Sequence, residues 1–539
     1  MKKIETLLIG AALTAAVVVA GGAVLRGVQK KLIKNSTYTY ETTKFGAFLA
    51  AQHAIYINDF ESANRFAAVL GEMEYPIVQN TKMLAEYLSG SLPASAKLLE
   101  KEKSVPAQLV YDTYLVKEGK WDELYKRHKG DESALMAPMR IWSSVATGHA
   151  EDAIKFIETL PTATPWKHFV RGQIYAEQGD IQKAADEFAK VQADFLNLND
   201  YMYIMSFYAK NDMTAPADAL RAEFTAMPGG MFLLDYDGVP AWDTFAGTAN
   251  ALGFSLVQNV SHTQIMMYSD LAILMLRMAQ IVSPGIAMDS DAINYYLGQY
   301  FFHNNGDYAR HFDQINSASP FYPFAILRKA EKSGDVKAIA RVLNEYPLFV
   351  PAVNSMIAHH ISHDNRRAAL RVVNAALNDE RLSDVSHAFF LKSRAQIHYV
   401  FGDYKAANAD IRAAADVLVA DPEILALQAK IWAAQGREIE TAYEYAMSLV
   451  QRAPADIFAW DTLGRVVTVR EGADAALDLL ERVGQIANNC SALFEQLGDL
   501  HAATGDTAAA AAAYRRAIEL GDDGVIVIPN VEKKLRKLK

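Results

Sequence analysis

The chain has 539 residues, a formal net charge of −10 at pH 7 and a single cysteine. The excess of acidic residues argues against a nucleic-acid-binding protein, which needs a basic surface, and the lone cysteine excludes an internal disulfide framework and a four-cysteine zinc site. Apolar residues make up 51% of the sequence and charged residues 22%, which is typical of a folded helical protein with a sizeable core.

An uncharged, apolar run extends from Leu7 to Leu25. At roughly 1.5 Å per residue, a helix of this length spans the hydrocarbon core of a bilayer, which is about 30 Å thick. We therefore predict that residues 1–34 are a membrane anchor or a signal segment with a basic flank. The small residues from Ala20 to Ala23 would suit a signal peptidase, so a cleaved signal is an alternative, and a buried core helix is another.

Basic residues lie on both sides of this run, and they give opposite indications of topology. Lys2 and Lys3 precede the run, as in exported proteins. Four basic residues follow it: Arg26, Lys30, Lys31 and Lys34. The positive-inside rule taken alone would keep the rest of the chain in the cytoplasm.

Helical pairs are expected from residue 41 to residue 226. Turn-forming residues recur there at intervals of 29 to 32 positions, at Asn58, Gly90, Gly119, Gly148, Gly179 and Asn211. In the best of these pairs, Gly172, Tyr175, Ala184 and Phe188 keep the spacing of a 34-residue helix-turn-helix repeat. We predict degenerate repeats over this part of the chain.

Residues 227–243 interrupt the pattern, because two prolines and three glycines fall in the stretch MPGGMFLLDYDGVPAW. We expect an exposed hinge or linker here, followed by irregular helical repeats over 244–380. The stretch SDLAILMLRMAQIV in that part is too short between Asp270 and Arg277 for a second membrane span. A fully buried helix is the prediction for it.

Two clusters contain residue types that can bind a metal ion. His359 and His363 share a helix face, as zinc ligands often do, but no glutamate completes an HExxH motif and no third ligand can be assigned. The DYDG sequence from Asp235 is similar to the start of a calcium loop, yet Ala246 stands where the glutamate ligand is required. We therefore predict no catalytic residue, no metal site and no cofactor, and we interpret the histidines as the polar end of a helix.

The most regular part of the chain is residues 383–521. Its last unit, 491–524, fits the repeat pattern W-x2-L-G-x2-Y followed by A-x3-F, with Phe494, Leu497, Gly498, His501, Ala510 and Tyr514 at these positions. The unit 34 residues upstream carries Trp460, Leu463, Gly464, Ala476 and Leu480 in the same register. The small residues are expected where two antiparallel helices approach closely.

On these motifs the chain resembles the bacterial tetratricopeptide repeat proteins. It is also similar to a long, envelope-associated branch of that family in alphaproteobacteria. The resemblance implies an all-α fold, a right-handed α-solenoid of helix pairs, with adaptor function in place of chemistry. Residues 522–539 form a basic tail that we expect to cap the open end of the solenoid, with contact to anionic lipid as the alternative.

The resemblance also implies a binding surface, because in this family the first helix of each pair lines a concave groove. The residues that would project into it from the best repeats are Lys392, Gln396, Lys430, Asp461, Arg465, Glu495 and Asp499. These side chains are polar and of both charges, which suits an extended peptide or a helix end bound by hydrogen bonds and charge pairs. A solvated face with no partner is the alternative.

We therefore predict a membrane-tethered scaffold of the bacterial cell envelope that binds another protein, is not an enzyme, and takes no nucleic acid and no small-molecule substrate. Because the resemblance is to envelope proteins and long domains can cross a membrane despite flanking charge, we expect the repeats in the periplasm, with the cytoplasm as the alternative. Two other functions stay open: a structural subunit of an envelope assembly without a peptide ligand, and a metal-dependent enzyme that uses the histidines of 359–364.

Overall fold

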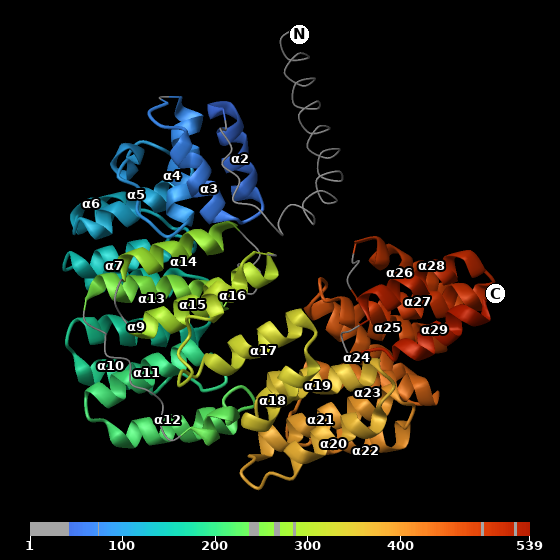
Figure 1. Ribbon diagram of the computed structural model, residues 1–539. Helices are drawn as coiled ribbons and strands as arrows, with labels where there is room; N and C mark the ends of the chain where they lie inside the picture. Colours follow the sequence, from blue (N-terminus) through green and yellow to red (C-terminus); the bar gives the residue numbers. More distant parts are fainter. Residues whose placement is uncertain are drawn as a thin grey trace.

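The computed structural model describes residues 43–73, 75–236, 247–262, 270–283, 287–304, 306–486, 490–521 and 525–538. Every regular element in these ranges is helical, so the expected all-α class is confirmed there. The helices form an arc of two arms: those between residues 44 and 226 build the first arm, those between residues 248 and 312 pack back against it, and those from residue 322 onward build the second (Figure 1). The anchor or signal expected at 1–34 lies outside the described residues, and none of the described helices is long and apolar enough to cross a membrane.

The helices form antiparallel pairs joined by short turns. The first half comprises α2 (Lys44–Tyr56), α3 (Phe60–Val69), α4 (Pro76–Leu88), the 3-10 helix η1 (Ala96–Leu99), α5 (Val105–Lys117), α6 (Trp121–His128), α7 (Ala137–Ala146), α8 (Ala150–Thr159), α9 (Thr164–Glu177), α10 (Ile181–Phe188), α11 (Leu198–Lys210), α12 (Thr214–Ala226) and the 3-10 helix η2 (Met231–Asp235).

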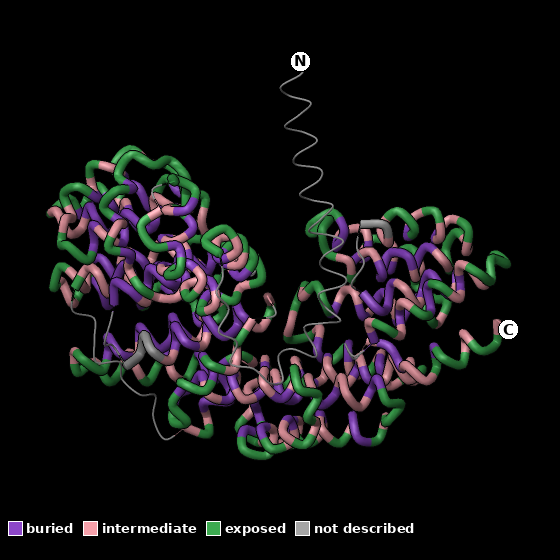
Figure 2. Tube along the Cα trace, turned by 45° about the horizontal axis from the view of Figure 1, so that its top comes forward, coloured by how far each residue is buried: buried purple, intermediate pink, exposed green. Residues whose placement is uncertain are grey.

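The second half continues with α13 (Thr248–His262), α14 (Asp270–Val282), α15 (Ala287–His303), α16 (Tyr308–Phe312), α17 (Tyr322–Ser333), α18 (Val336–Glu345), α19 (Val350–Ser362), α20 (Arg366–Leu377), α21 (Asp384–Val400), α22 (Tyr404–Ala415), α23 (Pro422–Gln435), α24 (Ile439–Arg452), α25 (Ile457–Arg470), α26 (Ala473–Ile486), α27 (Ser491–Thr504), α28 (Thr507–Leu520) and α29 (Ile528–Lys537). Buried residues run along both arms of the arc instead of forming one central core (Figure 2).

A Gly-Asp step makes the turn inside the last pair. Gly505 ends α27 with a φ of +90°, a conformation that costs glycine little. Asp506 then begins α28, and its carboxylate accepts a hydrogen bond from the Ala509 N–H at 2.9 Å. The same cap begins α10, α18 and α22, at Asp180, Asp335 and Asp403. Local sequence therefore sets where one helix stops and its partner starts.

At the expected turn near Asn211 the positive φ falls on Asp212, and at the turn between α19 and α20 it falls on Asp364. Asn365 instead caps α20, where its side chain accepts a hydrogen bond from the backbone N–H three residues later. Asp tolerates the left-handed conformation better than most residues, which leaves the amide side chain free to cap.

Close approach at a glycine joins the two helices in three of the pairs. A Cβ placed on Gly498 would lie 2.4 Å from two ring atoms of Tyr514, on the facing helix α28. The same relation, with the large side chain sixteen positions after the glycine, recurs at Gly464 with Leu480 and at Gly172 with Phe188. The expected close helix contact is confirmed at these positions.

The helices that follow residue 247 fold back across the first half of the chain. α14 packs against α4 and α5, and α13 packs against α7 and α9, as Figure 1 shows for the green helices. At this seam the Trp142 indole N–H donates to the Ser255 hydroxyl at 2.7 Å. α5, α7 and α9 are the first helices of their pairs. In the family that the chain resembles, this side of the first helices lines a groove, whereas here α13 and α14 cover it.

α14 is buried along almost its whole length, as expected for this apolar stretch. Arg277 is included in the buried face, with 6% of its surface exposed. Its guanidinium donates to the Leu88 carbonyl at 2.6 Å and to the Gln280 side chain at 2.7 Å. Burial lowers the pKa of Arg277 to about 10. Arg277, whose charge argues against a membrane span, thus links α14 to α4 through its hydrogen bond to Leu88.

The segment expected to be an exposed linker is in part a packed connection. Met231, Phe232 and Leu233 in η2 are at most 1% exposed, so the expected exposure does not hold for them. Arg381 pairs with Asp235 at 2.8 Å, which ties η2 to the C-terminal repeats. These apolar side chains fill the junction between the two arms, and residues 237–243 of the expected linker lie outside the described residues.

Replacement of Gly498 by leucine tests the close contact. We expect Gly498→Leu to lower the free energy of unfolding by about 3 kcal/mol, because the new side chain must displace the Tyr514 ring from a tightly packed position. Thermal and denaturant unfolding of the purified chain measure this loss.

Ala512→Leu is the matched control, since Ala512 is exposed on α28 and tolerates a larger side chain. The double variant Gly498→Leu/Tyr514→Ala should recover part of the loss. If Gly498→Leu unfolds at the same denaturant concentration as the parent chain, the assigned register is wrong.

Candidate functional site

The predicted groove residues lie on the first helices of four successive pairs. α21 carries Lys392 and Gln396, α23 carries Lys430, α25 carries Asp461 and Arg465, and α27 carries Glu495 and Asp499. Six of the seven are held in ion pairs. The Arg465–Asp461 pair lies within α25, and the other pairs join one repeat to the next or to α29. The charged surface is therefore built largely from internal pairs.

Three of these residues form one buried ion-pair triad. The Lys430 Nζ lies 2.7 Å from Asp461 Oδ2, and the Arg465 guanidinium lies 3.0 Å from Asp461 Oδ1. Asp461 is completely buried. Burial alone would raise the pKa of the Asp461 carboxyl, but the two cations outweigh it and hold the pKa at about 2. The triad fixes α23 against α25.

Lys392 makes the corresponding link one repeat earlier. Its Nζ lies 2.5 Å from Glu423 Oε2 and 3.5 Å from Asp421 Oδ2, and its side chain is only 11% exposed. Asp421 also caps α23, where it accepts the backbone N–H groups of Glu423 and Ile424. Lys392 therefore holds α21 against the start of α23.

The basic tail covers the groove residues of the last repeat. Lys534 on α29 lies 2.8 Å from Glu495 and 2.7 Å from Asp499. Burial opposes the charged form of Lys534, yet the two carboxylates raise its pKa above the ordinary value. Val531 on the same helix is fully buried. α29 thus packs on the end of the repeats as a cap does.

A cavity of about 420 Å³ opens between α19, α21, α23 and α25, and it takes in Lys392, Gln396 and Lys430. Its lining includes the apolar side chains of Ile357, Phe389 and Leu427, beside the polar Ser393 and Gln396. The cavity therefore offers apolar contact together with the polar side chains of Ser393 and Gln396, which take no part in the ion pairs. Such a combination suits the binding of a protein segment.

The chain's own C-terminal segment reaches this cavity. Val525 lines its edge, and Val527 lies in the same buried cluster as Ile357 and Phe390. The sequence analysis did not foresee the apolar lining or this return of the tail. The apolar run from Val525 to Ile528 was the only signal available, and it does not say which repeat it will contact.

The histidine cluster ends α19. The rings of His359 and His363 lie 4.2 Å apart, and the His363 Nδ1 lies 2.8 Å from the His359 carbonyl oxygen. Burial, together with neighbouring cationic groups, lowers the pKa of His360. In the part of the chain that the structure describes, no group of three or more His, Cys, Asp or Glu side chains is arranged to hold a metal ion. Asp235 of the calcium-like sequence pairs with Arg381, and its position 246 is outside the described residues.

No protein-family model and no curated protein sequence matches the chain. Among solved structures, it is similar to a tetratricopeptide repeat protein from Parabacteroides merdae, with 13% identity and a TM-score of 0.32 over 54% of this chain and 99% of that one. It is similar to the APC/C hetero-tetramer Cut9-Hcn1, with 12% identity and a TM-score of 0.34, and to yeast Tom70, with 11% and 0.27. Each of these two matches covers 92% of this chain and 96% of the other.

Similarities at these TM-scores do not define what the chain binds. Its tetratricopeptide-like character is carried by its own helix pairs, with a glycine of the first helix against a large side chain of the second. The finer resemblance to envelope proteins of alphaproteobacteria stays a prediction.

The triad predicts a large effect of a small substitution. Asp461→Asn should lower the free energy of unfolding by about 3–5 kcal/mol, because Lys430 and Arg465 would lose the carboxylate that compensates their burial. Chemical denaturation measures the change. Asp478→Asn is the control, since Asp478 pairs with Arg482 on the surface, with both side chains about three-quarters exposed, and should change stability by less than about 1 kcal/mol.

Comparison of the parent chain with Asp461→Asn also predicts how the stability depends on pH. The carboxyl of Asp461 has a pKa of about 2 when folded and 3.8 as the ordinary value, so its ion pairs contribute fully above the ordinary value and are lost as the pH falls toward 2. The stability difference between the parent chain and Asp461→Asn should therefore shrink by about 2 kcal/mol between about pH 4 and about pH 2. A difference that stays constant over this range would show that Asp461 does not act through its charge.

Proposed function

We propose that the chain is a membrane-tethered scaffold of the bacterial cell envelope, which binds a segment of another protein in the groove of its C-terminal repeats and performs no reaction. The observation that carries this proposal is the cavity between α19, α21, α23 and α25, with apolar and polar side chains on first helices of successive pairs. The first half of the chain offers no equivalent surface on α5, α7 and α9, because α13 and α14 pack there.

The groove is prepared to bind without reorganisation. Lys392, Lys430 and Asp461 are held by ion pairs, so the helices that form the walls are braced against one another. Binding then costs little ordering of these side chains. An apolar side chain of the partner would contact Phe389 and Leu427, and its backbone would hydrogen-bond to Gln396 and Ser393.

The C-terminal segment supports this choice of partner. Val525 lines the edge of the cavity, so a β-branched side chain already lies beside its apolar lining. A partner segment with valine or isoleucine at alternate positions would match the same surface. Membrane tethering and location in the periplasm are part of the proposal and rest on the sequence of residues 1–34.

A structural role without a peptide ligand is the second candidate, and exposed apolar side chains at the N-terminal helices favour it. Phe45, Tyr56, Tyr75 and Ile77 are 60–82% exposed, although large apolar side chains are costly in water. Tyr56 and Ile77 line one cavity of about 670 Å³ near the N-terminal end of the arc. An assembly subunit would bury these side chains against another protein.

Cross-linking in intact cells separates the two candidates. A photo-reactive amino acid at Gln396 should capture a discrete protein, whereas the same group at Asp478, on the outer helix α26, should not. Phe389→Ala should reduce the yield from Gln396, because it removes apolar contact in the groove. Capture from Tyr56 with none from Gln396 would support the structural role and contradict the groove.

A reporter fusion tests the location. Alkaline phosphatase fused after Lys539 should be active in intact cells, because the repeats are proposed to lie in the periplasm. A fluorescent protein that folds only in the cytoplasm serves as the control fusion. An inactive phosphatase with a bright cytoplasmic fluorophore would place the repeats in the cytoplasm and leave the groove proposal intact.

A further inference from the structure

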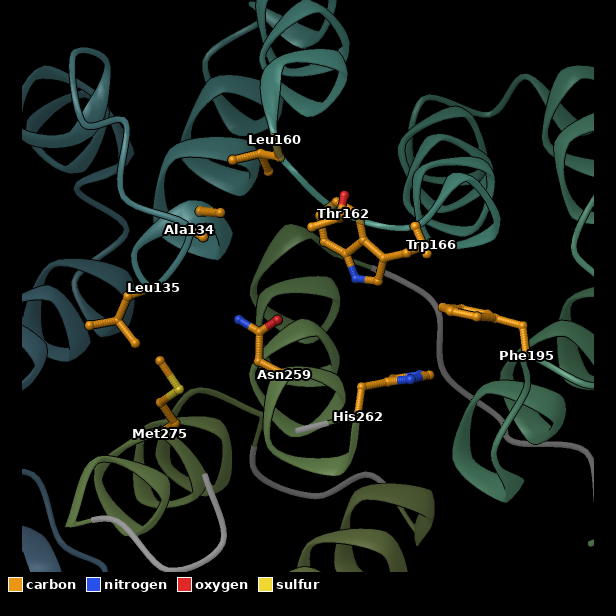
Figure 3. A pocket seen from close by; sticks show the side chains of 11 residues that line it. Ala134, Leu135, Leu160, Thr162, Trp166, Phe195, Asn259, His262 and Met275 are labelled. Atoms are coloured by element: carbon orange, nitrogen blue, oxygen red, sulfur yellow. The ribbon is translucent and has the colours of Figure 1, made fainter. Parts of the chain in front are cut away.

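A second cavity lies in the first arm, distant in the fold from the groove. It has a volume of about 440 Å³ and lies between the start of α7, the connection from α8 to α9, and the helices α13 and α14 (Figure 3). Its walls include the apolar side chains of Leu135, Leu160, Trp166, Phe195 and Met275. The volume and the aromatic lining are typical of a site for a small molecule.

Three polar residues line this apolar space: Thr162, Asn259 and His262 (Figure 3). The Thr162 hydroxyl oxygen is buried away from the cavity surface, so a molecule in the cavity would not reach it. Asn259 is only partly buried, and its amide lies at the cavity wall. An oxygen of a bound molecule can therefore accept a hydrogen bond from the Asn259 side chain.

His262 is held in place from behind. The completely buried Asp200 carboxylate pairs with its Nε2 and accepts a second hydrogen bond from Gln258 at 3.0 Å. Phe195 stacks on the imidazole, with ring centres 5.0 Å apart and planes 19° from parallel. Although burial opposes it, the buried Asp200 carboxylate raises the pKa of His262 above its ordinary value.

The cavity carries no net charge of its own. The described residues that line it include no Lys, Arg, Asp or Glu, and the charge of His262 is compensated by Asp200. An anionic ligand would leave its own charge uncompensated in an apolar space. The chemistry therefore favours an uncharged ligand.

We propose that this cavity binds an uncharged aromatic small molecule that carries a hydroxyl or carbonyl oxygen. The aromatic part lies against Trp166 and Phe195, and the oxygen accepts a hydrogen bond from the Asn259 amide. This site is independent of the groove, and it departs from our expectation that the chain takes no small molecule.

Equilibrium dialysis of the full chain tests the ligand class with three matched probes: 2-naphthol, naphthalene and 2-naphthoate. 2-Naphthol should bind saturably. Naphthalene, which lacks the oxygen, should bind about fivefold more weakly, as expected for the loss of one hydrogen bond. Tighter binding of the anionic 2-naphthoate would overturn the proposed class, and absence of saturable 2-naphthol binding would overturn the site.

Two variants place the probe in the cavity. Ala163→Trp introduces a large side chain at an exposed lining position and should abolish 2-naphthol binding. Ala189→Trp, at the exposed end of α10 and outside the cavity lining, should bind like the parent chain. Unchanged binding by Ala163→Trp would show that the probe binds elsewhere.

Asn259→Leu separates a binding role from a structural one. Leucine has nearly the same size and removes the amide, so 2-naphthol affinity should fall about fivefold while naphthalene affinity and the melting temperature change little. Unchanged 2-naphthol affinity in this variant would contradict the role of Asn259 in binding.

Discussion

Close packing between the two helices of each pair is the constraint on which the rest of the structure depends. Gly498 has no side chain where the Tyr514 ring lies, and Gly464 leaves the same room for Leu480. Two helices joined in this way still expose apolar residues, so each pair must stack on the next. The arc, its buried seams and its binding surfaces all follow from this repeated contact.

Both arms are built from stacked helix pairs, but the exposed side of their first helices differs. In the first arm, α13 and α14 pack against the first helices of earlier pairs, and seam contacts such as Trp142 to Ser255 satisfy the buried polar groups. In the second arm, the first helices border a cavity, and ion pairs link one repeat to the next. The first of these surfaces is thus buried within the fold, and the second is the one that we propose for a partner.

Charge in the groove braces the repeats more than it attracts a ligand. Asp461 is fully buried between Lys430 and Arg465, so little of its field reaches solvent. A buried pair of this kind stabilises the fold only while all its members are present. In the proposed groove, the apolar side chains of Phe389 and Leu427 would be the contact surface, and specificity would come from their shape and from neutral groups such as Gln396.

The sequence by itself determined the local elements: the all-α class, the Gly-Asp turns, the close contact at Gly498 and the burial of α14. These features depend on residues within one repeat, where the spacing along the chain determines which side chains are in contact. The placement of the seven candidate residues on first helices was also predictable, whereas their role in binding stays a prediction. Only the tertiary structure decided that α13 and α14 cover the first arm, that Met231 is buried, and that Lys534 and Val525 return to the groove. Such contacts join residues far apart in the chain, and their pairing depends on how the stacked repeats curve, which no local pattern records.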